Sequence, residues 1–168
     1  MTPPVLQTRR LTSRPVMPDD AAAIQNGINT WDVVQWLTAP PFPYSRDDAH
    51  FFIQEVIPAT TTWAIDPGEG LIGVIGIKPD LGYWLDHAYH GQRIMSEAAA
   101  AVVAWHFGQS DEALMSSHFL GNEASRRVLQ KQGFVDAGFE EQLQTATQET
   151  VTVQRMELTY KTWMAHHG

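Results

Sequence analysis

The stretch from Asp80 to Phe134 limits the possible folds of this chain more than any other part of its sequence. It starts with a short strand pattern that runs into a turn and a long alanine-rich helix, and it ends with a second helix between Asn122 and Gly133. Where a turn leads from a strand into a helix, the first backbone N–H groups lack intrahelical partners and the helix dipole is positive. The sequence therefore predicts an anion-binding site at the start of the long helix.

Strand and helix patterns follow one another along the whole chain. We expect strands at residues 8–16, 60–66, 71–78, 79–85, 113–119, 134–141 and 149–160. We expect helices at residues 21–28, 46–57, 92–107 and 122–132, with a helical turn at 31–36. Strands before, between and after helices predict an α/β fold of the mixed α+β kind, with helices on both faces of one sheet. No repeat or linker interrupts this order, so we expect residues 1–168 to form a single domain.

Composition excludes several classes of function. The chain has no cysteine, which rules out disulfides, thiolate metal sites and a cysteine nucleophile. Its net charge of -8 argues against nonspecific binding to nucleic acid. The longest apolar run, residues 98–103, is too short to span a membrane, and the N-terminus lacks the pattern of a signal peptide. We therefore expect a cytoplasmic protein without nucleic-acid or membrane partners.

The titratable side chains around the predicted anion site favour an anionic ligand over a metal ion. The basic residues that gather there are Arg93, Arg126, Arg127 and Lys131. In a chain this acidic, an anion needs such a local cluster. Asp86, His87 and His90 share no helical or strand spacing, so we expect no metal site.

Three segments carry a resemblance to a known family. Residues 41–53 contain Pro-Phe-Pro-Tyr-Ser, Asp-Ala and Phe-Ile; residues 81–92 contain Leu-Gly-Tyr-Trp-Leu-Asp, Ala-Tyr and Gly-Gln; residues 122–134 contain Asn-Glu-Ala-Ser-Arg-Arg-Val-Leu, Lys and Gly-Phe. In this order and spacing they resemble the GNAT superfamily of N-acetyltransferases, and more narrowly its branch of ribosomal-protein N-terminal acetyltransferases. The resemblance covers residues 8–159. It implies the GNAT acyl-CoA N-acyltransferase fold, with a central twisted, mixed but mostly antiparallel sheet of six to seven strands.

The resemblance also implies a reaction and its cofactor. An acetyl group would pass from acetyl-CoA to a primary amine, either a small-molecule amine or a peptide N-terminus, by direct attack of the amine without an acyl-enzyme. The pantetheine arm would lie along a strand, and the diphosphate would bind the N–H groups that open the next helix. The cofactor-binding residues implied are Tyr83, Trp84, Leu85, Gly91, Gln92, Arg93, Ile94, Met95, Ser96, Asn122, Ser125, Arg127 and Lys131.

The resemblance assigns candidate catalytic residues as well. Ser125 falls where this branch places a hydroxyl near the sulfur, suited to protonating the departing thiolate. Many other superfamily members use a tyrosine on this helix, at the position that Leu129 occupies here. Because an alkyl ammonium has a pKa of about 10, a base must take its proton. Asp80 and His118 are the two candidates for this base.

One departure from the family pattern leaves two readings open. Arg93 and Met95 stand where the family has a glycine and a glycine or alanine, which let the backbone approach a phosphate. Their side chains could block the site, or Arg93 could turn outward and contact a phosphate itself. The first reading allows a different function, a degenerate GNAT-fold module that binds a ligand or a protein without catalysis.

The acceptor is the least determined part of the prediction. Four aromatic residues before the second helix could line its site or could form core beneath a proline-rich loop. They are Trp31, Trp36, Phe42 and Tyr44. The closing hairpin around residues 149–156 could in addition pair in a homodimer.

Overall fold

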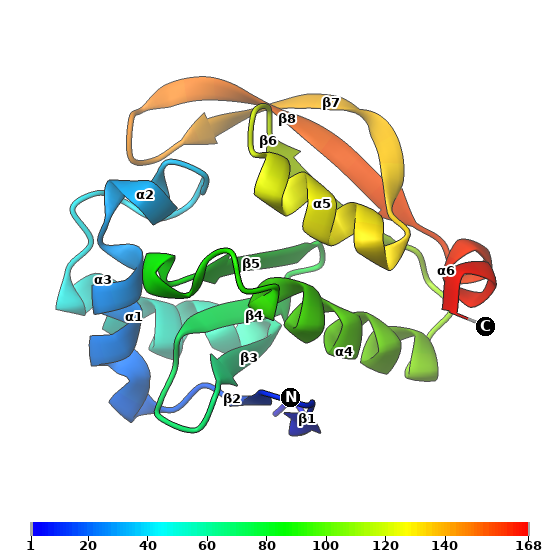
Figure 1. Ribbon diagram of the computed structural model, residues 1–168. Coiled ribbons are helices and arrows are strands. Elements are labelled where there is room, and N and C mark those ends of the chain that lie inside the picture. The colour runs from blue at the N-terminus through cyan, green and yellow to red at the C-terminus, as the bar shows by residue number, and fades with distance from the viewer. Residues whose placement is uncertain (1, 168) are drawn as a thin grey trace.

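An eight-stranded sheet runs through the computed structural model, which describes residues 2–167 (Figure 1). The strands are β1 (Leu6–Gln7), β2 (Thr12–Pro15), β3 (Thr61–Asp66), β4 (Gly73–Ile77), β5 (Leu81–Leu85), β6 (Leu114–Phe119), β7 (Val135–Gln144) and β8 (Glu149–Leu158). They lie in the order β1-β2-β3-β4-β5-β6-β8-β7, and all neighbours are antiparallel except β5 and β6, which are parallel. This mixed, mostly antiparallel sheet confirms the predicted fold class.

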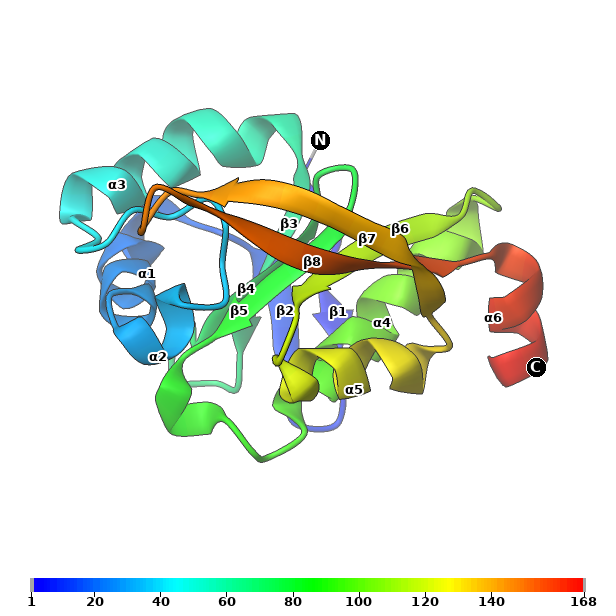
Figure 2. The same ribbon diagram turned by 90° about the horizontal axis from the view of Figure 1, so that it is seen from above.

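Helices cover both faces of the sheet (Figures 1 and 2). The α-helices are α1 (Ala21–Ile28), α2 (Trp31–Val34), α3 (Arg46–Phe51), α4 (Ile94–Gln109), α5 (Glu123–Gln132) and α6 (Tyr160–His167). Successive residues of β3 face opposite cores: Trp63 packs in the cluster that contains α4, and Ala64 packs in the cluster that contains α1. None of the helices described between residues 2 and 167 is long and apolar enough to cross a membrane.

The eighth strand comes from the N-terminus, where we expected one strand over residues 8–16. The chain instead turns between β1 and β2, with the Thr8 N–H donating to the Leu11 carbonyl at 2.9 Å. The two short strands then pair, with Leu6 facing Ser13 and Gln7 facing Thr12. The expected alternation holds only from the turn onward, so the sheet has one strand more than the six to seven expected.

The helix expected at residues 46–57 changes its winding and does not end before Pro58. It starts as predicted at Ser45, whose hydroxyl accepts the Asp48 N–H at 3.0 Å, while the Asp48 carboxylate accepts the Ser45 N–H at 2.8 Å. After α3 the chain forms a π-helical segment at Phe52–Val56 and a 3-10 turn at Ile57–Ala59. Pro58 fits this turn because the first residues of a helix need no N–H group.

The C-terminal helix α6 was not predicted from the sequence, because residues 160–167 show no helical apolar period. Its start is marked by Thr159, whose hydroxyl accepts the Thr162 N–H at 3.1 Å. Its packing is set by Trp163, whose ring stacks on Phe107 of α4 with centroids 5.2 Å apart. The helix therefore depends on a tertiary contact more than on its own sequence.

Candidate functional site

The candidate site opens where β5 and β6 separate. The two strands share one pair of facing residues, Leu81 and Ser116, and the Ser116 hydroxyl donates to the Leu81 carbonyl at 2.7 Å. Beyond this pair the strands diverge (Figure 2). The other edge of β5 is paired with β4, so in the described part of the chain the edge of residues 83–85 that faces β6 has no strand partner. Unpaired backbone groups of this kind can bind an extended ligand.

A cleft of about 730 Å³ occupies the space between the diverging strands. Its walls come from the first turn of α4, from one face of α5, from residues between 32 and 38 around the end of α2, and from β5, β6, β7 and β8. This volume is typical of a small-molecule site. The predicted site residues that line the cleft are Trp36, Asp80, Tyr83, Trp84, Leu85, Gly91, Arg93, Ile94, Met95, Ser96, His118, Asn122, Ser125, Arg127 and Lys131. Four others, Trp31, Phe42, Tyr44 and Gln92, are not part of its lining.

Two residues with positive φ shape the turn before α4. Gly91 has a φ of 78°, and Arg93 has a φ of 60° and a ψ of 21°, the left-handed conformation that glycine adopts readily. Because a left-handed residue cannot continue a right-handed helix, α4 begins at Ile94 and not at Gln92 as expected. The turn thus keeps the shape that small residues favour, although an arginine in this conformation costs about 1 kcal/mol.

The side chains of Arg93 and Met95 leave the cleft open. Arg93 is exposed at its edge. Met95 is only 7% exposed and packs in the core beneath α4. Since the cleft is present with both side chains in place, bulk at these two positions does not fill it.

Ser125 and Tyr83 both line the cleft and contact each other through their hydroxyl groups. Asn122 caps α5 as expected, its side-chain oxygen accepting the Ser125 N–H at 3.3 Å. The Ser125 hydroxyl then lies 2.8 Å from the Tyr83 hydroxyl, which also donates to the Ser125 carbonyl at 3.3 Å. Burial raises the pKa of Tyr83, and the hydrogen bond with Ser125 offsets only part of this effect, so the phenol keeps its proton at neutral pH. The prediction from sequence concerned only the backbone of Tyr83 and did not include this pair.

Asp80 lies in the cleft as one member of a charged network. Its Oδ2 accepts a 2.7 Å hydrogen bond from Arg155, and the same guanidinium nitrogen donates to the Ser117 hydroxyl at 2.7 Å. The Arg155 Nε atom lies 3.5 Å from Glu140. Arg155 was not predicted as a site residue. The signal available was its position on the same face of β8 as Val151 and Val153, where a third apolar residue would be typical.

His118 has a partner at each ring nitrogen. Its Nδ1 lies 3.0 Å from the Phe119 carbonyl, and its Nε2 lies 3.4 Å from Arg126. A carbonyl only accepts, so Nδ1 carries the proton and Nε2 faces the arginine as an acceptor. Arg126 also forms two hydrogen bonds of 3.1 Å with Asp136. Arg126 is therefore paired with Asp136 of β7 and does not line the cleft. The other three basic residues expected at the anion site do line it, namely Arg93, Arg127 and Lys131.

The four aromatic residues proposed for the acceptor lie in three different places. Trp36 lines the cleft and meets Phe119 edge-on at 6.3 Å. Trp31 and Phe42 form an exposed pair with ring centroids 5.7 Å apart. Tyr44 is buried in the core with α1 and α3, where its hydroxyl donates to the Asp48 carbonyl at 3.2 Å and burial raises its pKa to about 12. The structure thus brings only Trp36 of the four to the cleft.

Comparison with known proteins identifies this arrangement. Residues 10–135 match the acetyltransferase (GNAT) domain family. The chain belongs to this family. The GNAT acetyltransferase is also 31% identical over 124 residues to the ribosomal-protein-serine acetyltransferase of Escherichia coli strain K12, a match that covers 65% of the chain and 68% of that relative. Both findings confirm the predicted family and enzyme class, and the relative belongs to the branch that the three segments resemble.

Solved structures confirm the fold of this GNAT acetyltransferase. The ribosomal L7/L12 α-N-protein acetyltransferase RimL in complex with coenzyme A superposes with a TM-score of 0.80 at 20% identity, covering 93% of the chain and 98% of that structure. The microcin C7 self immunity acetyltransferase MccE in complex with acetyl-CoA and AMP superposes with a TM-score of 0.77 at 14% identity, covering 90% and 93%. At these identities the likeness concerns the fold.

Proposed function

We propose that this GNAT acetyltransferase moves an acetyl group from acetyl-CoA to a primary amine by direct attack, and that its acceptor is a peptide N-terminus. The observation that carries this proposal is the cleft itself, which joins the unpaired edge of β5 to the left-handed turn at the start of α4. The first feature suits an extended amide-containing chain, and the second suits a phosphate. Coenzyme A contains both an amide-linked arm and a diphosphate, so it can use both ends of the cleft.

The residues present fit coenzyme A in order along the cleft. Backbone groups of residues 83–85 would bind the pantetheine amides, and the N–H groups of the first turn of α4 would bind the diphosphate. Arg93, Arg127 and Lys131 line the cleft and would neutralise phosphate charge. When bound, the cofactor supplies an acetyl group activated as a thioester.

Ser125 is the residue proposed to protonate the departing thiolate. Its hydroxyl lies at the cleft end of α5, 2.8 Å from the neutral Tyr83 phenol. The tyrosine fixes the position of this hydroxyl and can return a proton to it. The pair therefore holds a proton at Ser125 Oγ, where leaving-group charge would develop.

Asp80 is the residue proposed to receive the proton of the acceptor amine. One of its carboxylate oxygens is held by Arg155, and the side chain is nearly half exposed in the cleft. Its Oδ1 makes no hydrogen bond among residues 2–167 and can accept from an ammonium group or from a water between them. His118 has both nitrogens engaged, so we propose Asp80 ahead of it.

The proposed acceptor class follows from the relatives and from the wall of the cleft. The curated relative acetylates a ribosomal protein, as its name states. Val33, Trp36 and Leu37 line the same cleft as Asp80 and offer apolar surface to the first side chain of a peptide. The acidic chain attracts a cationic N-terminus.

Two experiments in sequence test the proposed function. Calorimetry with acetyl-CoA comes first, and absence of binding at millimolar cofactor would overturn the enzyme proposal. Turnover of acetyl-CoA is then compared between short peptides with free N-termini, the same peptides with blocked N-termini, and small primary amines. Activity confined to the small amines would overturn the peptide acceptor and leave the transferase.

The non-catalytic alternative rested on Arg93 and Met95. The left-handed turn at Arg93 and the burial of Met95 remove its structural basis, because the cleft stays open. Tight cofactor binding without turnover on any acceptor would be the result that restores it.

A further inference from the structure

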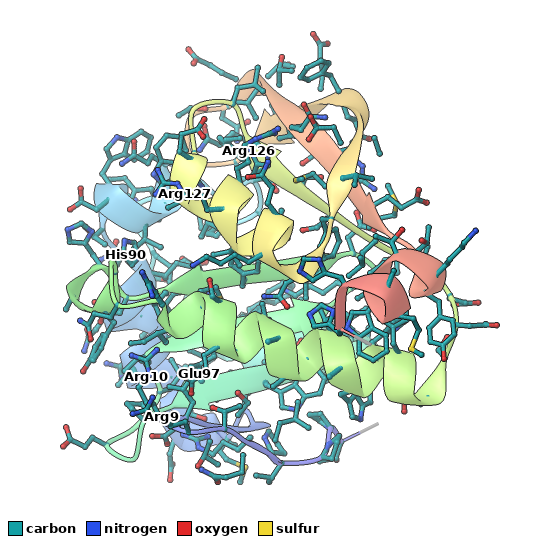
Figure 3. The ribbon with its side chains drawn as sticks, turned by 45° about the vertical axis from the view of Figure 1, so that its right-hand side comes forward. Arg9, Arg10, His90, Glu97, Arg126 and Arg127 are labelled. Carbon is teal, nitrogen blue, oxygen red and sulfur yellow. The ribbon has the colours of Figure 1, made fainter. Side chains whose placement is uncertain are left out.

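The turn between β1 and β2 is fastened to the start of α4. Glu97 on α4 accepts hydrogen bonds from the Thr8 hydroxyl, from the Arg10 N–H at 2.9 Å and from Arg10 Nε at 2.8 Å. A further nitrogen of Arg10, Nη1, donates to the Gln92 carbonyl at 2.9 Å. In Figure 3, Arg10 and Glu97 lie below the first turn of α4 and Arg127 lies above it. Arg10 therefore joins Gln92, in the turn before α4, to Glu97 in the first turn of α4, although none of the three residues lines the cleft.

The carboxylate of Glu97 depends on this contact. Its side chain is 18% exposed, and burial alone would raise its pKa. The hydrogen bonds from Thr8 and Arg10 outweigh burial and lower the pKa, so the group is charged at neutral pH. Without Arg10, an uncompensated negative charge would stand one turn from the proposed diphosphate site.

The bond to the Gln92 carbonyl fixes a peptide group next to the left-handed residue. In a trans peptide the carbonyl and the following N–H point in opposite directions. When Arg10 holds the Gln92 carbonyl, the Arg93 N–H must point away from Arg10. Arg93 is one of two non-glycine residues with positive φ in residues 2–167, so its conformation needs support from its surroundings.

We propose that Arg10 is a positioning residue for the phosphate-binding turn. It neutralises Glu97 and holds the peptide between Gln92 and Arg93, which lets residue 93 keep a left-handed conformation without being glycine. The inference rests on the proposed function, because it assigns the turn to the diphosphate of coenzyme A. It adds a residue from the N-terminal hairpin to the cofactor site.

The test compares Arg10→Ala and Arg10→Lys with Arg9→Ala, a neighbouring exposed arginine that makes no such bonds (Figure 3). Affinity for 3′-phospho-ADP, which carries the 5′-diphosphate and the 3′-phosphate of the cofactor, is measured by calorimetry. Affinity for acetyl-pantetheine, which lacks the diphosphate, is measured by NMR titration at millimolar concentrations. Arg10→Ala should weaken 3′-phospho-ADP about tenfold and leave acetyl-pantetheine within about twofold.

Arg10→Lys keeps the charge but cannot hold Glu97 and Gln92 together, so it should lose most of the same affinity, whereas Arg9→Ala should change little. In the free protein, amide hydrogen exchange at residues 92–94 should accelerate in Arg10→Ala and not in Arg9→Ala. Equal weakening of both cofactor fragments, or 3′-phospho-ADP affinity within twofold of wild type, would overturn the positioning role. Failure of the wild type to bind either fragment would overturn the proposed function instead, and the inference with it.

Discussion

The hydroxyl groups of Tyr83 on β5 and Ser125 in the first turn of α5 lie 2.8 Å apart. Forty-two positions separate the two residues in sequence. The contact joins β5 to α5 near the place where β5 and β6 separate. It places a protonated phenol behind the serine proposed as the acid.

Replacing Ser125 by Ala tests this pair. If the serine hydroxyl delivers the proton to the thiolate, turnover should fall about a hundredfold while the affinity for acetyl-CoA stays nearly unchanged. In Tyr83→Phe turnover should fall by less, about tenfold, because the serine hydroxyl remains. The double variant should be no slower than Ser125→Ala alone, since the two groups act as one unit. Unchanged turnover in Ser125→Ala would remove the hydroxyl from the mechanism.

Replacing Arg93 by Gly separates the backbone of the turn from its side chain. Glycine adopts the left-handed conformation without strain, so the free energy of unfolding should hold or rise by up to about 1 kcal/mol. The exposed guanidinium at the cleft edge would be lost, so the Kd for coenzyme A should rise about tenfold. Chemical denaturation and calorimetry measure the two effects. A tighter complex would show that Arg93 obstructs the phosphates.

Replacing Met95 by Ala should lower the stability of the protein and leave its affinity for coenzyme A nearly unchanged, the reverse of the result expected for Arg93→Gly. Met95 is buried in the core cluster with Val102 and Leu129, so its truncation leaves a cavity and should cost about 2–4 kcal/mol of stability. Met95 also lines the cleft, but it is only 7% exposed, so coenzyme A affinity at a temperature well below unfolding should change little. A large change in affinity with little loss of stability would show that Met95 serves the ligand more than the core.

Local signals in the sequence predicted local structure, and they failed where distant segments meet. The Asn122 cap and the Gly133 stop fixed α5 to within one residue, because both act through the neighbouring backbone. The pair Asp80–Arg155 spans 75 positions, and the Arg10–Glu97 pair spans 87. The apolar–polar periodicity of a strand or helix gives no information about such distant partners. The helix α6 was not predicted for the same reason, because its packing depends on the distant contact between Trp163 and Phe107.

The Glu97 contact should also be visible in the acid stability of the protein. The hydrogen bonds from Thr8 and Arg10 lower the pKa of Glu97 in the folded state below its ordinary value of 4.5. A carboxylate of this kind contributes stability above the unfolded pKa and loses it as the pH falls through the folded pKa. Glu97→Gln should therefore be less stable than wild type at pH 7, with a difference that shrinks below about pH 4. Parallel stability curves over this range would contradict the assignment.

Gln144 offers a test of how the wall of the cleft is held. Its side-chain nitrogen donates to the carbonyls of Val34, Gln35 and Leu37 at 3.4, 3.1 and 3.2 Å, and it joins the end of α2 to β7. In Gln144→Glu a buried carboxylate would face these carbonyls with nothing to donate, so stability at pH 7 should fall by about 2–3 kcal/mol. Protonation restores a donor, so the loss should diminish at acid pH. Gln130→Glu, the same change at an exposed position of α5, serves as the control in urea denaturation. Equal effects of the two substitutions would show that these three bonds do not hold the wall in place.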